Sequence, residues 1–530
     1  MTLVEILVGL VALCVVLAVL ARGAQIPPAV ALVFGGMALA LVPGLPRLEF
    51  DPHIALALFL PPLLQVSAFR TDWDAFRLEL RPILLLALGA VLFTAAVVAA
   101  TAHWLVPGLP WAACIALGAI VAPPDAVAAA AVLKTIHIPR RLMTILEGES
   151  LLNDASSLIL YRFAVAATAT ASVSFTEAGT AFVLSAVGGT AVGWAVGRMV
   201  MQATRALGDT LLEIAAIVLS GFVAYIAAEY LHLSGVLAAV ACGLVFGRNQ
   251  HAMLSARTRV ESAAVWNFIE FLLTSLIFIL IGLQLRDVIE RLDQGVLTLI
   301  TVAGAVSLAL VLSRFVWVFA SAGIARLLPA RMRLRHAVMP LSHLTVISWA
   351  GMRGVVSLAA ALALPTGFPG RDLIIFLAFC AILVTLVLQG TTLGWVILKL
   401  GVVGASEAHA ADQEARVRRA GAEAALAAVE QRLFRGRVLG QPDTDMLREF
   451  RRRAETARLM EQHRGLTVRR NEARLQLEIE AVQVARGAVL RHAQTLDGEV
   501  LQSIIEEMDF EEGRLNRALR HPAGGHSAGG

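Results

Sequence analysis

Charged residues are scarce in this chain of 530 residues. They make up 16% of the sequence, against about a quarter in an ordinary soluble protein. Hydrophobic residues make up 58%, and the mean hydropathy is +0.74. This composition excludes an ordinary soluble globular protein and indicates a membrane protein with many spans.

Cysteine is also scarce, with four residues in the chain. All four lie inside apolar runs and none forms a CxxC pair: Cys14, Cys114, Cys242 and Cys380. This pattern argues against a disulfide framework and a cysteine-based metal site. The chain also lacks the HExxH sequence of metalloproteases, and its polar tail holds no nucleotide-binding glycine pattern. We therefore predict a protein without a cofactor and without a nucleic-acid partner.

Long apolar segments follow one another along residues 1–401. Windows of about 20 apolar residues predict an all-α membrane domain with about thirteen spans. The predicted spans are 3–21, 26–42, 53–69, 82–103, 111–134, 142–167, 176–201, 211–229, 233–247, 262–285, 296–325, 338–364 and 372–400. In the seventh span Gly189, Gly193 and Gly197 recur every four residues, a spacing that favours close packing against another helix.

The basic residues of the loops predict an orientation. Every loop on one predicted face carries arginine or lysine, whereas the opposite loops carry only Arg47, Arg286, Arg291 and Arg371. The positive-inside rule then places the N-terminus outside and the C-terminus in the cytoplasm. An odd number of spans gives the same result, because it puts the two ends on opposite faces.

The composition changes after Gly401. Residues 402–530 hold twenty acidic and twenty basic residues, and all the basic ones are arginine. We predict a cytoplasmic tail with helices near 411–434, 445–463 and 468–494, breaks at glycines such as Gly436 and Gly465, and a disordered end. The tail is either a solvated helical appendage or a regulatory or dimerising domain.

Polar residues inside three predicted spans suggest a functional site. In the fifth span, Pro123 and Pro124 remove two backbone donors and precede Asp125. We expect the helix to break there, as transporter helices do beside ion sites. The alternative is a simple proline kink in which Asp125 caps the following helix.

The sixth span carries the densest polar cluster. Glu149 and Asn153 are four residues apart and share a helix face, and Ser150 and Asp154 lie on the adjacent face. Carboxylates at membrane depth are costly and usually mark an ion or proton pathway. Hydrogen bonding between helices alone would need several carboxylate partners in lipid.

Two arginines lie at similar depth in later spans. Arg314 needs a carboxylate partner, for which Asp125, Glu149 and Asp154 are the candidates. Arg353, in the neighbouring span, is a second candidate to pair with Glu149. It is bracketed by Gly351 and Gly354, which predict an opening of the twelfth span. The fifth and twelfth spans lie seven apart, as expected for two inverted halves with one broken helix each.

Four motifs together resemble a known family: Gly148-Glu-Ser-Leu-Leu-Asn-Asp154, Pro124-Asp125-Ala-Val-Ala, Leu231-His-Leu-Ser-Gly-Val-Leu237 and Gly351-Met-Arg-Gly-Val-Val-Ser357. In this order and spacing they look like the monovalent cation:proton antiporters of the NhaP/NHE sodium–proton exchanger group, in its bacterial branch. The resemblance covers residues 1 to about 400. It implies thirteen helices, a dimerisation domain, a mobile six-helix core, and a homodimer in the bacterial inner membrane.

The resemblance also implies roles for the polar residues. Asp154 would carry the cation or the proton, with Asn153 beside it, and Asp125 and Ser150 would help line the Na⁺ site. Competition between Na⁺ and H⁺ for one carboxylate then gives antiport.

Charge balance predicts the stoichiometry. Asn153 cannot carry a second proton, and the resemblance pairs Glu149 with Arg314, while Arg353 belongs to the broken crossing helix. We therefore predict electroneutral 1:1 exchange. The alternatives are a K⁺/H⁺ exchanger or cation channel on the same fold, and an intramembrane aspartyl protease using Asp125 and Asp154. The chain lacks the Gly-x-Gly-Asp signature that is expected of such a protease.

Overall fold

The computed structural model of the protein describes most of the chain. The described residues are 3–24, 26–42, 52–125, 129, 133, 136, 138–170, 175–283, 295–327, 339–402, 407–434, 444–462, 464–491 and 498–520. They form helices and no strands within these ranges. The chain divides into two compact units, Met1–Val403 and Gly404–Gly530.

The helices of the first unit contact one another mainly within two groups. One group, which we call the glycine-packed bundle, contains α1 (Leu3–Gly23), α2 (Pro28–Ala40), α3 (Pro52–Arg70), α10 (Phe175–Leu207), α11 (Thr210–Tyr230), α12 (Gly235–Met253) and α13 (Ala256–Leu283). Glycines bring its backbones together: a Cβ atom on Gly189 or Gly193 of α10 would overlap a carbonyl oxygen of the α12 segment. The four-residue glycine spacing therefore serves close helix packing, as predicted.

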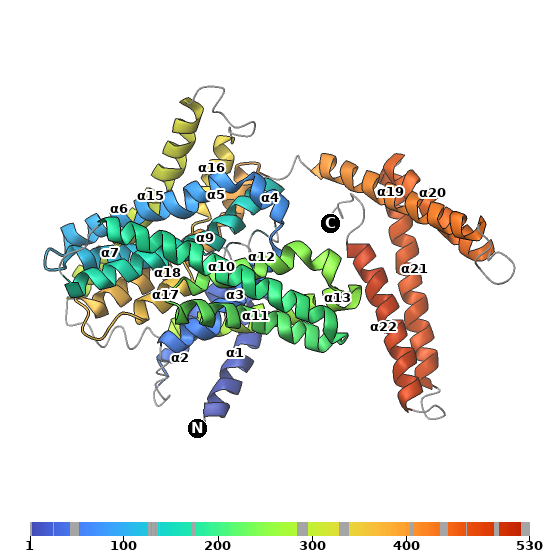
Figure 1. Ribbon diagram of the computed structural model, residues 1–530, viewed down its shortest axis with the longest axis horizontal. Helices are drawn as coiled ribbons and strands as arrows, with labels where there is room; N and C mark the ends of the chain where they lie inside the picture. The colour runs from blue at the N-terminus through green and yellow to red at the C-terminus, as the bar shows by residue number, and fades with distance from the viewer. Residues whose placement is uncertain are drawn as a thin grey trace. The chain divides into compact units, whose positions relative to one another are not determined.

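The other group, which we call the site bundle, holds the two irregular spans. It contains α4 (Trp73–Leu78), α5 (Leu80–Leu84), the π-helix η1 (Leu85–Ala90), α6 (Val91–Leu105), α7 (Trp111–Val121), α9 (Arg140–Thr170), α15 (Val296–Leu327), α16 (Leu341–Trp349), α17 (Val355–Leu362) and α18 (Arg371–Lys399). In Figure 1, α6 and α7 lie at one end of the first unit and α13 lies toward the other.

Both predicted breaks are present. Helix α7 ends at Val121, directly before the two prolines, and residues 350–354 separate α16 from α17. The breaks lie against each other, because the Asp125 backbone N–H donates to the Met352 carbonyl at 2.7 Å. Most of the second half of the fifth predicted span lies outside the described residues, apart from positions such as Ala129 and Leu133, which are helical.

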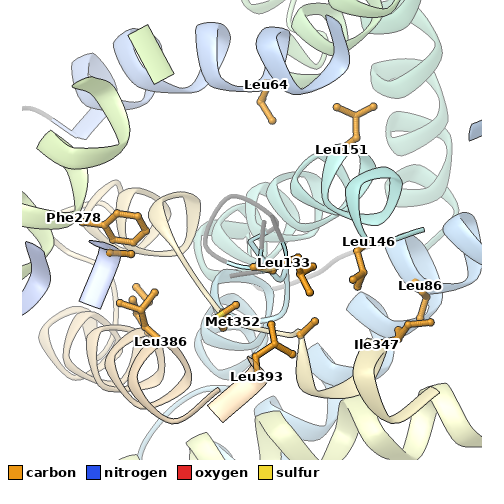
Figure 2. Close-up of a cluster of buried hydrophobic side chains, with 14 of the residues drawn as sticks. Leu64, Leu86, Leu133, Leu146, Leu151, Phe278, Ile347, Met352, Leu386 and Leu393 are labelled. Atoms are coloured by element: carbon orange, nitrogen blue, oxygen red, sulfur yellow. The ribbon is translucent and has the colours of Figure 1, made fainter. Parts of the chain in front are cut away.

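An extensive apolar cluster surrounds the crossing, the place where the two helix breaks contact each other. Met352, in the second break, is 1% exposed and belongs to this cluster, in which Figure 2 shows it together with Leu133, Leu386 and Leu393. Burial of this apolar contact surface stabilises a backbone segment that has lost its helical hydrogen bonds. The crossing is therefore part of a packed core.

Several helices are longer than the predicted spans. The predicted span 233–247 becomes Gly235–Met253, and 176–201 becomes Phe175–Leu207. Within the described ranges six helices are long and apolar enough to cross a membrane, and three shorter apolar helices accompany them. The count of thirteen spans stays a prediction. The π-helix η1 inside the fourth span was not predicted.

The turn between α11 and α12 contains the Leu231–Leu237 motif. His232 adopts a positive φ of 57°, and the Ser234 side chain accepts a hydrogen bond from the Leu237 backbone N–H as the cap of α12. The Gly235 N–H donates to Glu229 at 3.2 Å. Glu229 in turn accepts two hydrogen bonds from Arg162 of α9, at 2.7 and 2.8 Å, so this ion pair joins the two bundles.

The second unit consists of helical hairpins. Helix α19 (Glu407–Phe434) packs on α20 (Thr444–Gln462), and α21 (Arg464–Arg491) packs on α22 (Gly498–Arg520). Arginine–carboxylate pairs join each hairpin, such as Arg458 with Glu423 at 2.7 Å. The hydrogen bond from Arg458 holds the pKa of Glu423 below its usual value.

One prediction for the tail needs correction. The break predicted at Gly465 lies before this residue, because α20 ends at Gln462 and α21 begins at Arg464 and includes the glycine. The backbone N–H groups in the first turn of a helix have no intrahelical partner, so a glycine is tolerated there. Gly465 therefore stands at the start of a helix and not at its end. Helix α22 was not predicted. The predicted break at Gly436 and the predicted disordered end lie outside the described residues.

Candidate functional site

A small cavity lies between the two bundles. It has a volume of about 60 Å³, which is room for a few particles the size of a water molecule. Its walls come from α3 and α13 of the glycine-packed bundle, and from α9, α17 and the first break of the site bundle. The polar side chains that line it are Ser67, Asp125, Ser150, Asp154, Thr274 and Ser357. The remaining lining includes Leu60, Leu63, Leu64 and Leu151.

The structure divides the predicted site residues into two sets. The cavity is lined by Pro123, Pro124, Asp125, Ser150, Asp154 and Gly354. The others are buried or partly buried outside the lining: Glu149, Asn153, Arg314, Gly351 and Arg353. The first set provides carboxylate and hydroxyl oxygens at the cavity. The second set holds the helices that position them.

Asp154 and Asn153 lie in the middle of α9. The Asp154 side chain faces the cavity, and the residue is 8% exposed. Asn153 is fully buried, and its amide Nδ2 donates to the Pro124 carbonyl at 2.8 Å. This bond satisfies a carbonyl at the break and ties α9 to it. Asn153 therefore positions the site and is not part of the cavity lining.

Asp125 lies at the crossing of the two breaks. Its carboxylate is so close to Gly354 that any side chain at position 354 would overlap it. Gly354 is also the cap residue before α17, so the Asp125 carboxylate lies at the N-terminus of this helix. The partial positive charge of a helix N-terminus stabilises an anion there.

Glu149 and Arg314 form a buried ion pair. Two hydrogen bonds of 2.5 and 2.8 Å join the guanidinium to the two carboxylate oxygens. The side chains are 1% and 2% exposed, and Arg314 also donates to the Ile347 carbonyl of α16. A buried pair is tolerated when its geometry is good and its remaining donors are satisfied. Both conditions hold here, so Glu149 is electrically compensated.

Arg353 has a different set of partners. Its guanidinium donates to the carbonyls of Val121 at 2.8 Å and Ala122 at 3.1 Å, and also to the Gly351 carbonyl. These carbonyls lie at the C-terminal ends of α7 and α16, where the helix dipoles favour a cation. Of the two arginines that the sequence left open, Arg314 contacts Glu149, and Arg353 binds the broken backbone.

Sequence reasoning missed several supporting hydroxyls. Ser156 donates to the Ala87 carbonyl in the π-helix at 2.6 Å, and Ser157 donates to the Ala119 carbonyl at 2.8 Å. The Thr385 hydroxyl accepts the Arg353 backbone N–H at 3.1 Å. The two serines two and three positions after Asp154, in an otherwise apolar run, were a usable signal. Thr274 and Thr385 lie in largely apolar stretches of their helices, so nothing in the sequence indicated their roles.

The described residues contain no group of three or more His, Cys, Asp or Glu side chains arranged to hold a metal ion. The lining of the cavity is mainly apolar, but it includes two carboxylates and several hydroxyl groups, whose oxygens can bind a small monovalent cation or a proton.

Comparison with known proteins decides the family. Residues 9–399 match the family described as sodium/hydrogen exchanger, transmembrane. The chain belongs to this family. Curated relatives of the chain include proteins named as antiporters.

Two curated relatives show the extent of the match. A sodium, potassium, lithium and rubidium/H⁺ antiporter of Bacillus pumilus is 36% identical over 375 residues, which are 68% of this chain and 56% of that protein. This chain therefore spans little more than half the length of that antiporter. An uncharacterised Na⁺/H⁺ exchanger of Mycobacterium bovis is 32% identical over 525 residues, 96% of each chain.

A solved structure shows the same fold. The sodium proton antiporter MjNhaP1 from Methanocaldococcus jannaschii matches with a TM-score of 0.60 and 18% identity, over 75% of this chain and 98% of that one. The predicted all-α membrane fold is therefore confirmed, and it is shared with this solved structure.

Proposed function

We propose that this protein exchanges a monovalent cation, Na⁺ first, for H⁺ across the membrane, with Asp154 binding the cation and the proton in turn. The observation that carries the proposal is the buried Asp154 carboxylate at the wall of a small cavity between two helix bundles. When ionised it attracts a cation, and when protonated it releases it. Movement of one bundle relative to the other would expose this cavity to each side in turn.

The neighbouring charges support electroneutral 1:1 exchange. Glu149 is compensated by Arg314, and the Asp125 carboxylate lies at the N-terminus of α17. Asn153 carries no charge and its amide binds the Pro124 carbonyl. Asp154 is left as the carboxylate whose charge changes during the cycle.

The cation selectivity is a second part of the proposal. The Bacillus pumilus relative is named for sodium, potassium, lithium and rubidium, so K⁺/H⁺ exchange on the same site is the alternative to Na⁺/H⁺ exchange. We also propose a homodimer in the bacterial inner membrane, with the N-terminus outside and the C-terminus cytoplasmic.

Proteoliposomes test the function. Addition of Na⁺, Li⁺, K⁺ or Rb⁺ should dissipate an imposed pH gradient with the wild type and should have no effect with Asp154→Asn, which cannot exchange a proton for a cation. A membrane potential imposed without ion gradients should drive no Na⁺ uptake. Uptake driven by the potential alone would contradict the 1:1 stoichiometry. Flux that persists in Asp154→Asn would contradict the role of this carboxylate.

A further inference from the structure

Thr274 of α13 is a polar residue of the cavity that the motifs do not include. It lines the same cavity as Asp154 and Ser150 but belongs to the glycine-packed bundle. Its neighbours in the sequence, Phe271-Leu-Leu before it and Leu276-Ile-Phe shortly after it, are apolar.

The hydroxyl group of Thr274 has an unusual environment for this protein. Its oxygen is buried, and it forms no hydrogen bond with any other described residue. Threonines in helices commonly donate to the carbonyl four residues earlier. In this chain Thr101, Thr190 and Thr391 do so, at 2.8, 2.8 and 2.6 Å. The Thr274 hydroxyl is not satisfied in this way, although the helix continues through this position.

An unsatisfied buried hydroxyl costs free energy unless something binds it. At this position the available space is the cavity, which also borders two carboxylates. A hydroxyl oxygen is a neutral ligand for a small cation, and it can also bind a water molecule of the hydration shell.

We propose that the Thr274 hydroxyl is a ligand of the transported cation, either directly or through a water molecule that the cation keeps. This inference rests on the proposed function and adds a ligand from the opposite wall to those of the site bundle. Because Thr274 belongs to the other bundle, it takes part in binding in the present arrangement and leaves the shell when the bundles separate. It therefore contributes to affinity without altering the charge balance.

The test compares variants of Thr274 in proteoliposomes by the Na⁺ dependence of proton flux. Thr274→Val keeps the shape and removes the hydroxyl, and it should raise the half-saturating Na⁺ concentration about three- to tenfold, the effect of one neutral hydrogen-bonding ligand. The maximal rate should change less than about twofold, because binding is lost without loss of the carrier. Thr274→Ser restores the oxygen and should stay within about twofold of the wild type.

Two further variants make the result specific. Ser275→Ala removes a buried hydroxyl from the next position of α13, which does not line the cavity, and should leave the half-saturating concentration unchanged. Thr274→Ala provides a second removal of the hydroxyl if the valine variant inserts poorly. Na⁺ should raise the melting temperature of the wild type and of Thr274→Ser more than that of Thr274→Val, a difference that a purely structural role would not produce.

The outcomes separate this inference from the proposed function. Absence of cation-dependent proton flux in the wild type would overturn the proposed function. Normal Na⁺ dependence of Thr274→Val, together with an inactive Asp154→Asn, would overturn only the role of Thr274. Equal losses in Thr274→Val and Thr274→Ser would also contradict it, because the serine retains the oxygen.

Discussion

The two bundles of the membrane unit bury different kinds of polar side chain. The site bundle contains all the charged side chains that are buried among the described residues: Glu149, Asp154, Arg314 and Arg353. The glycine-packed bundle buries neutral polar groups such as Gln65, which donates to the Ile217 carbonyl at 2.7 Å. Its helices are held at close distance by glycines that face backbone atoms.

The two bundles therefore have different structural roles. Charges inside a membrane protein require fixed partners, and the site bundle supplies an ion pair and helix-end carbonyls for three of its four buried charges. Asp154 faces a cavity instead. The glycine-packed bundle offers a close-packed wall for that cavity. We expect the two bundles to respond differently to mutation.

The largest effect is expected from breaking the buried ion pair. Arg314→Met leaves the Glu149 carboxylate uncompensated and should destabilise the protein by about 3–5 kcal/mol, with strong loss of folded protein. The double variant Glu149→Leu/Arg314→Met removes both charges and should recover much of the stability. Thermal unfolding of detergent-purified protein measures both. If the double variant were no more stable than Arg314→Met alone, the pairing would be wrong.

A smaller effect is expected from the packing of the other bundle. Gly193→Ala places a Cβ atom against the Ala238 carbonyl and should destabilise by about 1–3 kcal/mol, because two backbones must separate. Gly304→Ala in α15 is the matched control, since its Cβ would contact nothing within 4 Å. The control should be neutral or slightly stabilising, because alanine favours the helix. Equal melting temperatures for the two variants would contradict close packing at Gly193.

The smallest effect is expected where the bundles meet. The Arg162–Glu229 pair is half to one-third exposed in its side chains, so its loss in Arg162→Gln should cost at most about 1 kcal/mol. The equilibrium constant between the two arrangements of the bundles should also change, by up to about fivefold. The charge exchange Arg162→Glu/Glu229→Arg should restore wild-type transport rates in proteoliposomes more closely than either single change. Failure of this rescue would show that the pair does not link the bundles in the membrane.

Features that depend on neighbouring residues were predictable. The proline pair at Pro123 ends α7, and the glycines around Arg353 accompany the second break. The helical spacing of Glu149, Ser150, Asn153 and Asp154 holds because all four lie on α9. The tail was less predictable: the break lies before Gly465, which is the second residue of α21, and a single glycine can stand at either end of a helix.

Partnerships across long sequence separations were not predictable from the residues alone. Glu149 and Arg314 are 165 positions apart, and the residues alone left two arginines as candidates. Arg353 reaches carbonyls more than 230 positions away, which carry no sequence signature because every residue has a carbonyl. The π-helix at Leu85–Ala90 likewise has no proline or glycine pair to announce it.

The sequence by itself determined that this protein crosses a membrane, that two spans break, and that two carboxylates lie close together on one helix, because hydropathy, proline geometry and helical spacing act over a few residues. Only the tertiary structure decided which arginine neutralises Glu149, that the Asn153 amide binds the break, and that Thr274 faces the same cavity as Asp154. These depend on how distant helices pack, and packing is set by the sum of many weak contacts along the whole chain.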